Sequence, residues 1–134
     1  MHARRYVELI AACVVLPCAL RLCSAGWVLR MLHRTPRRWR TTEARPERLA
    51  WAVDVVQSRL PWIWRRTCLR RAAVLALLLR REGRDARVSI GVRRAPTGEL
   101  EAHAWVTCDG VDPYLEPGDT ASFAPLVGGS HAAP

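Results

Sequence analysis

The residue best suited to covalent chemistry is Cys68, at the start of the apolar run CLRRAAVLALLL, residues 68–79. Thr67 before this run and Gly83 after it predict a buried helix that begins after a threonine N-cap and stops at a glycine. At the first turn of a helix, free backbone N–H groups and the positive end of the macrodipole favour a thiolate over a thiol. Cys68 is therefore a candidate nucleophile, with a small apolar side chain filling a helix end as the alternative.

A matching proton acceptor is His103, in the segment EAHAWV. A thiol nucleophile needs a base that takes and returns its proton, and His103 is the one histidine expected inside a regular element. The other three lie in polar or terminal stretches: His2, His33 and His131. On a strand, His103 and Trp105 share one face, whereas Cys108 points to the other and is expected in the core. A purely structural strand histidine is the alternative.

The third member of a triad would be a carboxylate that orients the imidazole. If residues 109–110, Asp-Gly, form a tight two-residue turn, residues whose numbers sum to 219 lie opposite each other. Glu116 then faces His103. Pro113 weakens this count near the turn, so two other carboxylates stay candidates for the same role: Asp112 and Asp109.

The amino-acid composition limits which reactions and binding partners the chain can have. A chain of 134 residues that is 50% hydrophobic is expected to form one compact domain with a real core. All 21 basic residues are arginine, which excludes Schiff-base and phosphate-loop lysines. Up to Arg71 there are 15 arginines and 4 acidic residues, and afterwards 6 and 8. The basic first half suits nucleic acid, an anionic membrane or an acidic partner, with an arginine-rich solvated surface as the alternative.

The N-terminal region raises the question of targeting. Its first 26 residues resemble a secretory signal, but Glu8 and Arg21 interrupt the pattern. The uncharged run 9–20 is shorter than a bilayer span, so a helix packed on the core or on a partner is expected, with membrane contact as the alternative. The five cysteines include no C-x-x-C pair, so neither a zinc site nor a disulfide framework is predicted, and no Gly-rich phosphate loop is present.

The remaining elements place these residues. Pro17 is expected to kink or split the first helical region, and residues 33–46 to form a polar, basic linker. Pro46 begins an amphipathic helix that ends before Pro61. Extended segments follow at 86–92 and 99–108, joined by RRAPTG, with a third after the 109–110 turn. Helices followed by a small antiparallel meander indicate an α+β fold.

Four sequence blocks resemble a known family: residues 67–92, AHAWV, DG and FAPL. They are similar to the leader peptidase of lasso peptide biosynthesis, a cysteine protease of transglutaminase-like (papain-like) fold, over residues 49–126. The resemblance implies catalytic roles for Cys68 and His103, because Cys-Leu and His-Ala-Trp stand where the family has them. The family's third residue is commonly Asp, and the matching position here holds Glu116.

The resemblance also implies partners. The family cuts the leader from a ribosomally made lasso precursor, and a separate ATP-dependent cyclase then closes the ring. Residues 1–45, a helical segment with a basic linker, do not look like the winged-helix leader-recognition domain, so this chain resembles the stand-alone peptidase of a split system, which needs a separate recognition protein. The peptidase core would span residues 46–126 and a flexible tail 127–134.

We therefore expect a cytoplasmic leader peptidase that needs no metal or cofactor and does not bind nucleic acid, with the N-terminal apolar segment as a candidate membrane contact. Trp62, Trp64 and Trp105 are candidates for walling the substrate cleft. Two rival functions remain: an arginine-rich nucleic-acid-binding module, which lacks a stacking platform, and a scaffold of the same fold that has lost catalysis.

Overall fold

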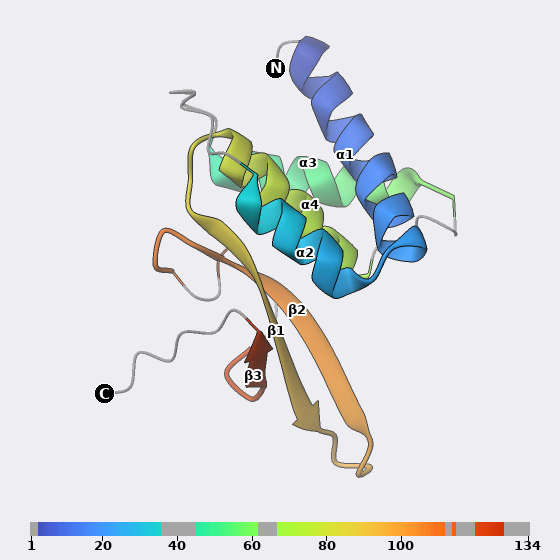
Figure 1. Cartoon of the computed structure of the whole chain (residues 1–134), viewed down its shortest axis with the longest axis vertical. Helices are drawn as coiled ribbons and strands as arrows, with labels where there is room; N and C mark the ends of the chain where they lie inside the picture. The colour runs from blue at the N-terminus through green and yellow to red at the C-terminus, as the bar shows by residue number, and fades with distance from the viewer. Residues whose placement is uncertain (1–2, 36–44, 62–66, 112–113, 115–119, 128–134) are drawn as a thin grey trace.

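The computed structural model describes residues 3–35, 45–61, 67–111, 114 and 120–127. Within them the chain forms four helices followed by three strands: α1 Ala3–Leu22, α2 Ala25–Arg34, α3 Pro46–Arg59, α4 Cys68–Arg81, β1 Ala86–Arg94, β2 Leu100–Cys108 and β3 Ala124–Val127. Figure 1 shows the helices gathered at one end of the long β1–β2 hairpin, whose turn projects away from them. The predicted α+β fold is confirmed.

The first helical region breaks at a different place from the one predicted. α1 runs through Pro17 without interruption, and the break comes at Ser24, whose hydroxyl accepts a hydrogen bond from the Trp27 amide at 3.3 Å and so caps α2. Pro17 is fully buried, as are Leu9 and Cys13 on the same helix. Burial of this apolar surface offsets the backbone hydrogen bond that a proline inside a helix removes.

α2 extends further than expected. It ends at Arg34, so His33, predicted to lie in the polar linker, is helical instead. The reason is visible in the packing, because α2 buries Val28, Leu29 and Leu32, three residues on one helical face. Residues 36–44, which make up most of the predicted linker, lie outside the described residues.

α3 begins with Pro46 in its first turn, as predicted, and buries Ala50, Val53 and Gln57. It packs against α4, most of whose residues from Ala72 to Leu79 are fully buried. α4 is the central helix, because α1, α2, α3 and the hairpin all contact it. Gly83, at φ 90°, follows α4 in the left-handed conformation that a helix-ending glycine supplies.

The sheet is antiparallel with strand order β2-β1-β3. The expected meander is correct for β1 and β2, which pair from Ala86 opposite Cys108 to Arg94 opposite Leu100. Of the third segment expected after the turn, Val111 and Tyr114 bond to β2, and residues 112–113 and 115–119 lie outside the described residues. β3 is a further strand that pairs with the other edge of β1, opposite Ile90 to Val92. β1 is therefore the central strand, with β2 on one side and β3 on the other. The hydrophobic alternation within single strands does not predict which strands pair.

The two faces of β2 are distinct. Ala104, Val106 and Cys108 join the buried core cluster, together with residues of α4. Trp105 is also buried but lies outside that cluster, on the alternate face with His103. The predicted core position of Cys108 is confirmed, since its side chain is fully buried.

Candidate active site

Cys68 is the first residue of α4, as the sequence predicted. The Thr67 hydroxyl accepts a hydrogen bond from the Arg70 amide at 3.3 Å, which confirms Thr67 as the N-cap. The Arg71 amide bonds the Thr67 carbonyl at 2.9 Å. This arrangement leaves the amides of Cys68 and Leu69 without a partner inside the helix. The Cys68 thiol forms no disulfide and is half-buried against the core cluster, so the candidate nucleophile lies in the same helical turn as these two amides.

An ion pair fixes this end of α4 against α3. Arg71 Nε donates to Asp54 Oδ1 at 2.8 Å, and a second guanidinium nitrogen lies 3.4 Å from Oδ2. The Arg71 side chain is 9% exposed and that of Asp54 29%, so the pair is largely shielded from water. A two-pronged contact of this kind restrains orientation as well as distance, and it acts one turn after Cys68.

His103 lies in the middle of an aromatic group. Its ring stacks with Trp105 at 6.1 Å between centroids and lies 5.5 Å from the ring of Phe123. The strand pairing sets His103 opposite Gly91, where an added Cβ would fall 2.8 Å from atoms of both Trp105 and Phe123. Glycine at this strand position is therefore what lets the two aromatic side chains close over β1.

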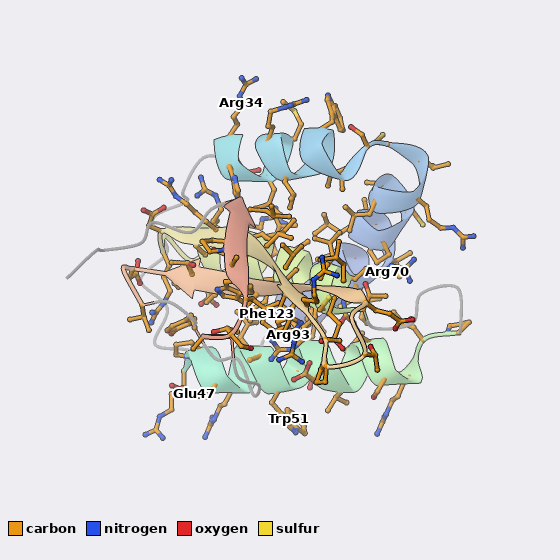
Figure 2. All side chains as sticks on the ribbon, turned by 90° about the horizontal axis from the view of Figure 1, so that it is seen from below. Arg34, Glu47, Trp51, Arg70, Arg93 and Phe123 are labelled. Atoms are coloured by element: carbon orange, nitrogen blue, oxygen red, sulfur yellow. The ribbon has the colours of Figure 1, made fainter. Side chains whose placement is uncertain are left out.

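Arg93 extends this group toward the open end of the hairpin. Its guanidinium lies 4.5 Å from the centroid of the Phe123 ring, a cation–π contact (Figure 2). Arg93 also donates to Glu101 at 2.6 Å and to the Ser122 hydroxyl at 2.9 Å. The segment before β3 is thereby held beside His103.

Cys68 and His103 come from neighbouring elements, because α4 packs against β2. Alternation along β2 turns His103 away from the face on which Ala104 and Val106 contact α4. The structure therefore places Cys68 and His103 on two elements that contact each other, α4 and β2.

The predicted turn is present. Asp109 and Gly110 both have positive φ, at 50° and 82°, and Cys108 pairs with Val111, in agreement with the count to 219. The count then shifts by one, since the Tyr114 amide donates to the Val106 carbonyl at 2.7 Å. Residue 113 is a proline and has no amide hydrogen for that bond.

This shift bears on which carboxylate is the candidate third residue of the triad. Glu116 and Asp112 lie outside the described residues, so neither is tested as the acid. Asp109 is engaged in the turn: it accepts a hydrogen bond from the Asp85 amide at 2.9 Å and lies 3.3 Å from the Arg84 guanidinium. These contacts give Asp109 a structural role between the start of β1 and the end of β2.

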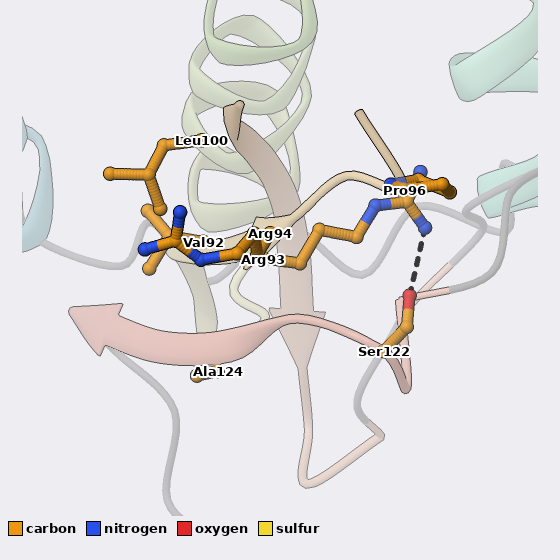
Figure 3. Close-up of a pocket in the computed structure, with 7 residues that line it drawn as sticks. All are labelled: Val92, Arg93, Arg94, Pro96, Leu100, Ser122 and Ala124. Carbon is orange, nitrogen blue, oxygen red and sulfur yellow. Dashed lines mark hydrogen bonds between the residues drawn. The ribbon is translucent and has the colours of Figure 1, made fainter. Parts of the chain in front are cut away.

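An open groove of about 610 Å³ lies at the far end of the hairpin (Figure 3). Its walls combine apolar and basic side chains: Val92, Arg93, Arg94, Pro96, Leu100, Ser122 and Ala124. Of the tryptophans predicted to line a cleft, Trp105 packs beside His103 instead of lining this groove, and Trp62 and Trp64 lie outside the described residues.

The described residues hold no group of three or more histidine, cysteine or acidic side chains that could bind a metal ion. None of the helices described is both long enough and apolar enough to cross a membrane. Two features beside the candidate site were missed from the sequence: the contacts of Gly91 and the apposition of Phe123. An isolated glycine inside a strand pattern indicates that another part of the chain approaches the backbone closely there, and Gly91 is such a glycine.

A protein-family model described as the transglutaminase-like superfamily matches residues 12–128 of the chain. The match begins within α1 and ends just after β3, so it includes the second half of α1, the other three helices and the whole sheet. No curated protein and no solved structure matches the chain.

Proposed function

Since the chain belongs to the transglutaminase-like superfamily, which includes cysteine proteases, we propose that it is a cysteine peptidase with Cys68 as nucleophile and His103 as base. The observation that carries this proposal is the position of Cys68 at the capped first turn of the buried central helix. An accessible sulfur beside free backbone amides is the arrangement that acyl transfer to a cysteine requires.

The proposed reaction proceeds in two stages. His103 takes the thiol proton, and the sulfur attacks the scissile carbonyl carbon, whose π electrons move to oxygen. The carbonyl re-forms as the C–N bond breaks, and the imidazolium gives its proton to the leaving amine. Water then attacks the thioester, releasing the N-terminal fragment as a carboxylic acid and restoring the thiol.

The proposed substrate is the precursor of a lasso peptide, cut between leader and core. Support comes from the sequence blocks around Cys68 and His103, which resemble those of the lasso leader peptidases. A separate winged-helix recognition protein would present the leader, and the ATP-dependent cyclase would act on the product.

The test is cleavage of a cognate precursor followed by mass spectrometry. Cys68→Ala should abolish cleavage while the circular dichroism spectrum stays unchanged, and near wild-type cleavage by this variant would end the proposal. His103→Ala should lose comparable activity, and the double variant should be no worse than either single one, because members of one catalytic unit are not additive. A scaffold without catalysis would leave the precursor intact in every variant, the wild type included.

The basic first half is proposed as the docking region for an acidic partner or leader. Arg37, Arg38 and Arg40 belong to a region with 15 arginines against 4 acidic residues. Affinity for the recognition protein and its leader should then fall as salt is added and when these three arginines are replaced by glutamine. Salt-insensitive binding would assign the arginines to solubility.

A further inference from the structure

The groove at the end of the hairpin carries a positive charge that the described part of the chain does not neutralise. Two of its seven lining residues are arginines, and none of the seven is acidic. Arg93 pairs with Glu101 at 2.6 Å, so its charge is balanced within the sheet. Arg94 is exposed, and its guanidinium donates at 2.8 Å to the Gly98 carbonyl, which carries no charge. Within the described residues no ion pair involves Arg94, so the groove favours an anionic ligand.

An apolar surface lies directly beside this charge. Leu100 stands opposite Arg94 in the pairing of β1 with β2, and 72% of its surface is exposed. Figure 3 shows Arg94 extending toward Leu100, whereas Arg93 extends the other way, toward Ser122. Apolar side chains that share one exposed groove with polar groups at its rim are typical of an interaction site. A ligand bound here would place an acidic group and an apolar group side by side.

The walls of the groove are joined by hydrogen bonds. Arg93, on β1, donates to Glu101 on β2 and, at 2.9 Å, to the hydroxyl of Ser122, which precedes β3. In the turn after β1, the amide of the buried Ala95 donates to the Glu99 carbonyl at 2.8 Å. A site whose walls are already in place loses less conformational entropy when a ligand binds.

The groove lies beyond the end of α4 that carries Cys68. Arg80, near the other end of α4, donates at 3.2 Å to the carbonyl of Ala86 at the start of β1, and the helix packs along this strand. From there α4 runs back twelve residues to Cys68, about 18 Å, and β1 runs eight residues to Arg94, about 26 Å. The hairpin therefore extends past the Cys68 end of the helix (Figure 1). Alternation puts Arg94 on the same face of β1 as Val88, which packs in the core cluster with α4.

We propose that this groove binds an acidic segment of an extended peptide substrate, with Arg94 pairing to a glutamate or aspartate side chain and Leu100 contacting an apolar neighbour. That the peptide is a substrate rests on the proposed function at Cys68. A peptide fits better than other anions because Ala124, which lines the groove, belongs to β3, an edge strand of the sheet. The outer edge of such a strand offers backbone groups to an extended chain. Arg94 is then a specificity-determining residue, since a guanidinium can bind a carboxylate through two hydrogen bonds.

The experiment measures the binding of two peptides to the Cys68→Ala protein, which lacks the proposed nucleophile and so leaves the peptides intact. The probes are short fluorescein-labelled peptides that differ only at the central position, where one has glutamate and the other lysine, between leucine and valine. Fluorescence anisotropy gives the two dissociation constants. At low salt the glutamate peptide should bind roughly tenfold more tightly, because the lysine peptide loses an attraction and gains a repulsion. Added salt should reduce this difference.

Charge reversal in the groove tests the assignment to Arg94. Arg94→Glu should reverse the preference, and Arg94→Gln should abolish it. Arg87→Glu is the matched control, because it makes the same change in net charge at an exposed arginine of β1 outside the groove, and it should keep the wild-type preference. Leu100→Ala should weaken the binding of both peptides by a similar factor. Thermal unfolding followed by circular dichroism checks that each variant is folded.

Several outcomes would overturn the proposal. Equal binding of the two peptides, or binding of neither, would show that the groove does not select an acidic side chain. A preference that Arg94→Glu leaves unchanged, or that Arg87→Glu reduces as much, would come from the net charge of the protein. Binding to phosphatidylglycerol vesicles that Arg94→Glu abolishes, with neither peptide bound, would assign the groove to a lipid headgroup. Failure of the proposed function looks different: the groove would still select the acidic peptide, but the wild-type protein would not cleave the precursor.

Discussion

The His33 ring of α2 accepts a hydrogen bond, through Nε2, from the backbone amide of Val88 in β1 at 3.2 Å. At the same corner, the buried guanidinium of Arg80 donates to the carbonyls of His33 at 2.7 Å, Thr35 at 3.0 Å and Ala86 at 3.2 Å. The end of α2, the end of α4 and the start of β1 are therefore joined by hydrogen bonds. The N-terminal helices are part of what holds the hairpin in place.

This corner makes stability depend on pH. His33 accepts the Val88 hydrogen bond only when neutral, and burial, followed by the charges of Arg80 and Arg87, lowers its pKa below the usual 6.5, with Asp85 acting in the opposite direction. Folding therefore favours the unprotonated ring. The contribution is complete above about pH 6.5 and is lost as the pH falls below that value. Urea unfolding at pH 7.5 and 5.5 should give a lower midpoint at pH 5.5.

A His33→Gln variant provides the control. The glutamine carbonyl is able to accept the Val88 hydrogen bond but does not titrate, so the variant should show a flatter dependence of the urea midpoint on pH. If the wild type and His33→Gln lose stability equally between pH 7.5 and 5.5, other groups are responsible for the loss.

The sequence was sufficient where local physics decides the structure. The helix that begins at Cys68, its Thr67 cap, the start of α3 at Pro46 and the turn at Asp109 each follow from rules that act over a few residues. The predicted break of the helix at Pro17 is wrong. Whether a proline is tolerated inside a helix depends on how it packs against the rest of the protein, and helix propensity contains no information on that packing.

In the candidate site too, only the residues whose positions follow from the local sequence could be predicted. Cys68 and His103 were found from residue type and local element, but the aromatic neighbour Phe123 comes from a segment about twenty residues further on.

Replacing Gly91 by alanine should disturb the packing around His103. The new Cβ would lie 2.8 Å from Phe123 Cβ and 2.8 Å from the Trp105 ring, so at least one aromatic side chain must shift. Overpacking of this kind costs about 1–3 kcal/mol, measured by urea unfolding. Gly26→Ala is the control, because nothing lies within 4 Å of its Cβ, and stability should be unchanged or slightly higher. Equal stability of Gly91→Ala and wild type would contradict the close approach.

Removing the carboxylate of Asp54 should destabilise the α3–α4 interface. Asp54→Asn leaves the largely buried Arg71 guanidinium facing a neutral amide, at a cost of roughly 1–3 kcal/mol, which is less than for a fully buried pair because Asp54 is partly exposed. The exposed Arg93–Glu101 pair is the comparison, and Glu101→Gln should cost less than about 1 kcal/mol. Chemical denaturation measures both, and a reversed order would contradict this assignment.

The five thiols should differ in reactivity in the folded protein. Burial raises the pKa of Cys13 to about 11 and that of Cys108 to about 11, so at pH 8 both are almost wholly protonated as well as inaccessible. Iodoacetamide followed by peptide mapping should modify Cys68 and the exposed Cys23 in the native state, with Cys68 faster. Cys13 and Cys108 should react only in urea. Faster modification of Cys23 would argue against an activated Cys68.

The last prediction concerns the acid that orients His103. Glu116→Gln keeps a hydrogen-bonding side chain but removes the charge that stabilises an imidazolium, so precursor turnover should fall while binding persists. Glu116→Asp should retain partial activity, because the charge remains on a shorter side chain. Asp112→Asn and Asp119→Asn, which change the other carboxylates of the same segment, should leave turnover close to that of the wild type.

Asp109→Asn separates stability from chemistry in the same series. Its carboxylate accepts the Asp85 amide and pairs with Arg84, so the variant should unfold at lower urea while its rate per folded molecule is preserved. The one-residue shift between Val111 and Tyr114 makes the identity of the acid a question of register. If Asp112→Asn abolishes turnover and Glu116→Gln stays active, Asp112 is the acid and the opposing position counted to 219 is wrong.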